Sequence, residues 1–234
     1  MKRSCHSGIS PIRAKPLKNQ QVKQIVAFIL LLAFFACQNK VQPQVSQEAF
    51  QQGMDYMLQR DSSRNFDYHK ARQSFRKAVR LDSTNMKAWR YQLVAEMNLS
   101  WHDSARQTVQ RALQQEELKD HKLKPHFYKM AAILEMLRDE ESTWRVYLEK
   151  ASQMYDERLE RDPDREDAWL EQISVLCWLG RKEEALKLVN SIHTEKHENI
   201  TPQRLEVLRD FIRDWNNQEM LENFRKPMAD RVDM

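Results

Sequence analysis

The chain has 234 residues, with 38 lysines and arginines against 34 aspartates and glutamates, for a formal net charge of +4. It contains only three glycines and seven prolines, too few for the many tight turns of a sheet protein. The scarcity of glycine also argues against a glycine-rich phosphate-binding loop, so the composition favours an all-helical chain.

The first 36 residues have the layout of a secretory signal. A basic stretch precedes an unbroken apolar run from Ile25 to Ala36, and polar sequence begins at Gln38, directly after Cys37. The charged, apolar and cleavage regions therefore follow in the usual order. The run is shorter than the roughly 20 residues that a membrane span needs. We expect residues 1–36 to be a cleaved signal peptide.

A cysteine at the cleavage point resembles the lipobox of bacterial lipoproteins, although Phe34 and Phe35 depart from its usual leucine and small residue. The resemblance implies lipidation of Cys37, palmitate among the acyl chains, and a cell-envelope protein anchored to a membrane, foremost the periplasm-facing outer membrane. An uncleaved anchor and an ordinary signal peptide remain alternatives, as does a translation start near Val22 rather than Met1.

Removal of the signal changes the charge and the thiol count. Residues 1–36 hold six of the 38 basic residues and no acidic residue, so residues 37–234 carry 32 basic and 34 acidic residues, a net charge of −2. The basicity belongs to the targeting segment, and no nucleic-acid partner is expected. With Cys37 acylated, Cys177 is the one thiol that remains, and its apolar surroundings predict a buried structural cysteine.

Residues 37–46 are predicted to be the lipidated N-terminus and a polar tether. Beyond them a pattern of bulky and small residues repeats. From Trp89, the residues at offsets of ten, sixteen, twenty and twenty-three are Leu99, Ala105, Val109 and Ala112. From Trp169, the same offsets give Leu179, Ala185, Val189 and Ile192. The repetition predicts helix pairs that bury their apolar stripes by stacking.

Two further copies are less regular. The first carries Gly53, Tyr56, Ala71, Phe75 and Ala78, with about six extra residues around 61–65. The third starts at Phe127 and allows two frames for its second helix, one through Thr143, Tyr147 and Lys150 and one through Ala151 and Tyr155 with Pro163 beyond. Residues 142–161 contain neither glycine nor proline, which predicts a helix of about five turns.

This pattern resembles the tetratricopeptide repeat. The resemblance implies an all-α fold, a right-handed superhelical stack of about four helix hairpins over residues 47–193. Residues 194–226 are expected to form a linker and a C-terminal capping helix, which begins with an N-cap at Thr201 and Pro202 at the first helical position. Residues 227–234 would be a short tail.

In the tetratricopeptide family, one face of the first helices lines a groove that binds a protein or peptide segment. Transferred to this sequence, the groove residues are Phe50, Met54, Met57, Arg90, Val94, Met97, Tyr128, Met136, Leu170 and Trp178. This set is apolar, rich in methionine and adaptable to apolar partners. The alternative is that these residues pack on neighbouring repeats or on the tail helix.

No catalytic constellation is recognised, so we expect a non-enzymatic scaffold without cofactor or metal. His193 and His197 are predicted to lie in a polar link rather than in a metal site. His121 and His126 are predicted to lie in a solvated basic turn or a weak site for anionic lipid or polymer. The alternative functions are a non-catalytic subunit of an envelope enzyme complex and a self-associating structural lipoprotein.

Overall fold

The computed structural model describes residues 42–58, 66–118, 121–138, 143–192 and 200–226. From Gln44 on, the chain forms one compact unit with its own core. Within the described ranges the regular structure is helical and no strand occurs. Cys37 and the signal segment lie outside them, as do the extra residues 61–65 and the link with His193 and His197.

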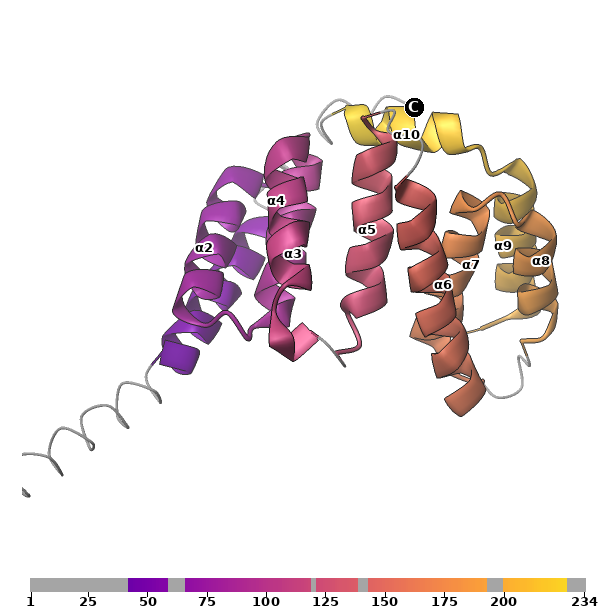
Figure 1. Cartoon of the computed structure of the whole chain (residues 1–234), viewed down its shortest axis with the longest axis horizontal. Coiled ribbons are helices and arrows are strands. Elements are labelled where there is room, and N and C mark those ends of the chain that lie inside the picture. Colours follow the sequence, from indigo (N-terminus) through magenta and orange to yellow (C-terminus); the bar gives the residue numbers. More distant parts are fainter. Residues whose placement is uncertain (1–41, 59–65, 119–120, 139–142, 193–199, 227–234) are drawn as a thin grey trace, which may run out of the picture. The chain divides into compact units, whose positions relative to one another are not determined.

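From α2 to α9, helices adjacent in sequence pack side by side (Figure 1). Helical residues 42–58 are followed by α2 (Tyr68–Leu81), α3 (Met86–Asn98), α4 (His102–Leu113), the short 3-10 helix η1 (Glu116–Leu118), α5 (Lys124–Met136), α6 (Trp144–Arg161), α7 (Glu166–Trp178), α8 (Lys182–Asn190), α9 (Pro202–Asp214) and α10 (Asn217–Arg225). The predicted all-α stack of helix hairpins is confirmed.

The repeat frame predicted from the sequence marks both ends of three helices. The fourth residue of α3, α5 and α7 is a buried aromatic, respectively Trp89, Phe127 and Trp169. The C-caps of the same helices are the leucines ten residues further on, Leu99, Leu137 and Leu179. Each aromatic therefore anchors the start of a helix whose length is set by the leucine that ends it.

Small residues at the predicted positions allow close helix packing. The alanines of the pattern are fully buried, namely Ala71, Ala78, Ala105, Ala112 and Ala185. Gly53 goes further, because a Cβ atom there would lie 2.5 Å from Cε1 of the buried Phe75 ring. Gly53 therefore permits the approach of helix 42–58 to α2 that any larger residue would prevent.

The structure decides the register of the third hairpin. α6 runs without interruption from Trp144 to Arg161, 18 residues, as the absence of glycine and proline predicts. Its buried residues are Leu148, Ala151, Ser152 and Tyr155, whereas Lys150 is exposed. The frame through Ala151 and Tyr155 is thus the one the fold uses, because these two residues are buried whereas Lys150 of the other frame is exposed.

The predicted tether is too long at its C-terminal end. Residues 44–46 are already helical, and Ser46 is fully buried. Its hydroxyl donates to the Ala78 carbonyl oxygen at 2.9 Å and accepts from Asn85 Nδ2 at 3.2 Å. These bonds hold the first helix against α2 and the start of α3, so the folded unit begins before residue 47.

The C-terminal segment also differs from the single capping helix expected. α9 begins as predicted, because Thr201 accepts from the Arg204 amide and Pro202 occupies the first turn. The helix ends at Trp215, and Asn216 caps a second helix, α10, by accepting from the amides of Gln218 and Glu219. The tail is therefore two helices with a sharp change of direction between them.

α10 returns to earlier parts of the stack. The Phe224 carbonyl oxygen lies 2.9 Å from His102 Nε2 at the start of α4, and Asn217 Nδ2 donates to the Trp178 carbonyl oxygen at 3.0 Å. One short helix thus ties the second hairpin to the fourth (Figure 1). None of the helices in the described ranges is both long and apolar enough to cross a membrane.

Candidate functional site

Four of the ten predicted groove residues are buried within the chain itself. Phe50 packs with ring centroids 5.7 Å from Phe75 and 5.6 Å from Tyr91. Trp178 is 2 % exposed because Trp215 and Phe224 of the tail lie against it at 5.1 and 6.4 Å. Met97 and Met136 are also buried. For these four the expected open groove is wrong, and packing on neighbouring helices and the tail is the correct interpretation.

The other predicted residues are more accessible. The half-buried ones are Met54, Met57, Arg90, Val94 and Tyr128. Tyr128 stacks on Tyr147 with centroids 6.2 Å apart, and the Arg90 guanidinium lies 5.9 Å from the Tyr91 ring. Leu170 alone among the ten is exposed, at 42 %. Their role in binding a partner stays a prediction.

Leu170 belongs to an apolar groove of about 430 Å³ between α7 and α9. Its walls are Trp169 and Leu170 from α7 and Val207, Leu208 and Phe211 from α9. Val207 is 70 % exposed and Phe211 46 %. Large apolar side chains that gather on one exposed surface mark a binding site more often than an isolated exposed leucine does.

The geometry of α9 explains why this groove stays open. Leu205 and Ile212, two turns apart, are the buried residues of α9, which packs on α8, and Leu205 also lines the groove. Val207 and Phe211, one turn apart, lie on a different side of the helix and remain exposed. α9 therefore covers the last hairpin as expected and presents a new apolar face. The sequence analysis did not identify Val207 as a site residue. A second apolar stripe on the same helix indicates that the helix has a second apolar contact surface.

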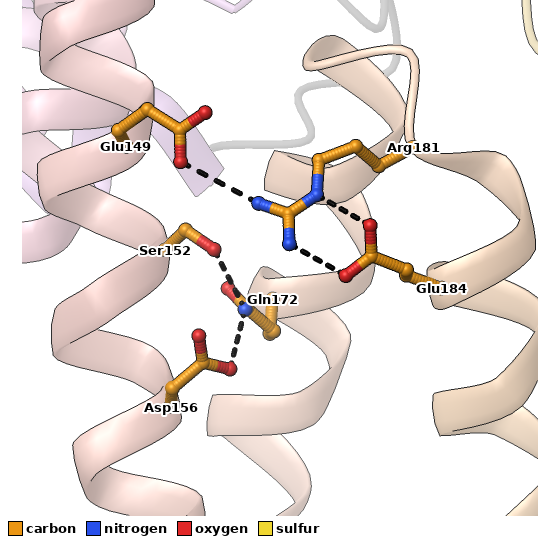
Figure 2. A network of polar contacts seen from close by, with 6 residues as sticks. All are labelled: Glu149, Ser152, Asp156, Gln172, Arg181 and Glu184. Carbon is orange, nitrogen blue, oxygen red and sulfur yellow. Dashed lines mark hydrogen bonds and ion pairs between the residues drawn. The ribbon is translucent and has the colours of Figure 1, made fainter.

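A second, polar cleft of about 810 Å³ runs along α6. Figure 2 shows Arg181 at one side of it, with Nε and Nη2 donating to the two Glu184 oxygens at 2.7 and 2.5 Å and Nη1 donating to Glu149 at 3.4 Å. The fork-shaped guanidinium joins α6 to the start of α8. These three residues are all partly exposed, so the arrangement contributes little stability.

Beneath this cleft, Gln172 of α7 reaches α6 (Figure 2). Its Nε2 donates to Ser152 Oγ at 2.9 Å and to Asp156 Oδ1 at 2.7 Å. Burial raises the pKa of Asp156, and the bond from Gln172 opposes that rise. No histidine or cysteine accompanies these groups among the lining residues. The network holds α7 to α6 and offers no paired nucleophile and base.

The expected basic turn is only partly solvated. His121 is half-buried, and His126 is the third residue of α5 with both ring nitrogens buried. His126 Nδ1 lies 3.7 Å from Glu171 Oε1 of α7, and Lys129 pairs with the same carboxylate. Burial lowers the pKa of His126, and the nearby Glu171 carboxylate opposes that effect. The prediction is therefore wrong for His126, because α5 begins earlier than the basic run suggested.

Burial raises the pKa of Glu171 on its own, but His126 and Lys129 outweigh that effect and hold the pKa at about 2. The carboxylate is thus ionised at neutral pH and anchors α7 to α5. Cys177 is fully buried, as predicted, and burial raises the pKa of its thiol to about 11. Such a thiol is inert. Across the residues described, no cluster of three metal-ligating side chains occurs.

The residues described define a helical-repeat protein whose exposed apolar surface lies between α7 and α9. No protein-family model matches the chain, and no curated protein does. Among solved structures, the crystal structure of MamA protein is similar to it, with 12 % sequence identity, coverage of 81 % of this chain and 87 % of that chain, and a TM-score of 0.40. A similarity this remote carries no argument about function, which has to come from the surface of this chain.

Proposed function

We propose that this protein is a lipid-anchored scaffold of the cell envelope that binds an apolar segment of a protein partner in the groove between α7 and α9. The observation that carries the proposal is the gathering of Leu170, Val207 and Phe211 around one groove of about 430 Å³. That volume matches the clefts that accept small apolar anchors.

The chemistry of the rim is consistent with a peptide ligand. Glu166, Gln203 and Arg204 border the apolar floor. A groove of this kind suits an amphipathic helix whose apolar residues recur at three- and four-residue spacing, with the polar rim setting its orientation. Aromatic and aliphatic anchors in such a groove supply most of the binding energy of a partner.

The membrane anchor in this proposal rests on the sequence. The apolar run that closes on Cys37 supports cleavage and acylation at that residue, and more than one acyl chain is needed for firm anchoring. Replacement of Cys37 by serine is expected to abolish lipid labelling and to release the protein from membranes washed at high salt, which weakens any purely electrostatic attachment. Membrane association that is unchanged in Cys37→Ser would refute the anchor without bearing on the groove.

The groove is tested by placing a photo-crosslinking amino acid at Val207 and, as a control, at Val146. Val146 is also an exposed valine, 53 % accessible, but lies on α6 outside the groove. We expect one envelope protein to crosslink at residue 207 and not at 146.

Val207→Asp is then expected to weaken binding of that protein by about thirtyfold, as for loss of an interface anchor. Val146→Asp, the matched control, should leave binding unchanged. Equal crosslinking at both sites, or equal binding by both variants, would refute the groove as the docking site.

A further inference from the structure

The exposed face of α2 is rich in cations and carries no acidic residue, with Gln73 and His69 as its other exposed side chains. Lys70, Arg72, Arg76, Lys77 and Arg80 lie on this helix, and no aspartate or glutamate does. Arg76 and Arg80 are one turn apart, and Lys77 follows Arg76, so these three exposed cations share one side of the helix. The opposite side is the buried stripe of Ala71, Phe75 and Ala78. α2 is thus a basic amphipathic helix, although residues 37–234 as a whole carry a net charge of −2.

Two of the five cations have partners. Lys70 pairs with Asp67 at 3.0 Å, and Arg72 Nε pairs with the buried Glu96 at 2.8 Å. In the described part of the chain, Arg76, Lys77 and Arg80 form no ion pair. The neighbouring helix adds the neutral Gln52 and Tyr56 to the same surface. Glu48, one turn from Gln52, is exposed, and no ion pair joins it to these three cations within the described residues.

The three unpaired cations lie where the chain enters the folded unit. Ser46 donates to the Ala78 carbonyl oxygen at 2.9 Å, so the first turns of helix 42–58 lie beside the last turns of α2. In sequence, only residues 38–41 separate Cys37 from this helix. A lipid on Cys37 would therefore attach the chain to the bilayer close in sequence to the helix that packs on α2.

We propose that the cationic face formed by Arg76, Lys77 and Arg80 docks the first hairpin onto an anionic lipid surface. Each cation near such a surface contributes attraction that amounts to roughly a fivefold gain in binding. The location of this contact at a cell membrane rests on the lipid anchor in the proposed function. Binding of the face to anionic lipid does not require acylation. Charge complementarity with phosphate headgroups, and the position beside the entry of the tether, select the bilayer as the occupant.

The test uses unacylated residues 38–234, which contain the whole compact unit and lack the basic, apolar signal segment. Co-sedimentation compares vesicles of phosphatidylethanolamine and phosphatidylglycerol with vesicles of phosphatidylcholine alone. We expect binding to the anionic vesicles that weakens at high salt. The triple variant Arg76→Gln, Lys77→Gln, Arg80→Gln is expected to lose on the order of 100-fold in this binding.

A matched triple variant, Arg111→Gln, Lys122→Gln, Lys187→Gln, removes the same charge from exposed positions elsewhere and should bind like the wild type. Circular dichroism spectra of both variants should match the wild type because all six side chains are exposed. An equal loss of vesicle binding in the two triple variants would overturn the proposal, because it would show that binding depends on the net charge of the protein and not on the α2 face. Equal binding to both kinds of vesicle, or preference for soluble polyphosphate over anionic vesicles, would also overturn it.

The acylated full-length chain separates this inference from the anchor. With the α2 triple variant, it should remain in the membrane fraction through Cys37. Loss of membrane retention in that form would show that the face is the main anchor and would count against lipidation, not against the cationic face.

Discussion

The turn between α3 and α4 and the turn between α7 and α8 have different residues directly after the helix C-cap, serine in the first and glycine in the second. That difference predicts a gain in stability. Ser100 has φ 55° and Gly180 has φ 76°, each directly after the leucine that caps its helix. In both turns an amide reaches back to the helix, from Trp101 to the Glu96 oxygen at 2.9 Å and from Arg181 to the Leu176 oxygen at 2.8 Å. This helix end requires a left-handed residue, which favours glycine.

The expected magnitude follows from the local geometry. A left-handed conformation costs about 1–2 kcal/mol for a residue with a Cβ, while glycine loses roughly 0.5–1 kcal/mol more in backbone entropy on folding. The Ser100 hydroxyl is in addition buried without a hydrogen-bond partner in the described structure, which adds a desolvation cost. Ser100→Gly should therefore stabilise the protein by about 1 kcal/mol.

The reciprocal change is a control. A Cβ at Gly180 would meet no atom within 4 Å, so Gly180→Ser adds backbone strain without a clash. It should destabilise the protein by about 0.5–1 kcal/mol. Urea denaturation would measure both free energies of unfolding, and thermal denaturation should show shifts of about 2–4 °C in opposite directions. Destabilisation by Ser100→Gly would refute the assignment of strain to this turn.

Two further predictions concern charges that join the helices. Glu96 is fully buried and bonds to Arg72. Glu96→Gln should therefore lower the free energy of unfolding by about 3 kcal/mol. The double variant Glu96→Gln, Arg72→Met should lose less than the sum of the losses in the two single variants. Additive losses in the double-mutant cycle would contradict a buried pair. Glu171 has a pKa of about 2, lowered from 4.5, so its contribution is present above about pH 5 and is lost as the pH falls toward 2. Glu171→Gln should flatten the dependence of unfolding free energy on pH in that window, and an unchanged slope would contradict the ion pair with Lys129.

The helical stack could be predicted from the sequence because the spacing patterns that indicate it involve residues close together in the chain. The offset from Trp89 to Leu99 spans one helix, and the spacing of Ala105 and Ala112 sets one close contact. Thr201 and Pro202 define a helix start without reference to any other element. The tail was harder, since the break at Trp215 depends on how α9 and α10 pack.

The candidate groove could be predicted only in part. Leu170 was correctly placed on an exposed face, because its position within the repeat is a local property. Trp178 was assigned to the same surface, yet α10 folds back and Trp215 and Phe224 cover it. Val207 escaped notice because nothing in its own helix shows whether a partner element will cover it.

The sequence by itself determined the helices, their caps and their pairwise packing, because backbone hydrogen bonding and the spacing of small residues act over a few turns. Only the tertiary structure decided which apolar residues remain open to a partner. That outcome depends on contacts between residues such as Trp178 and Phe224, which lie far apart in sequence and meet only when the last helix returns to the stack.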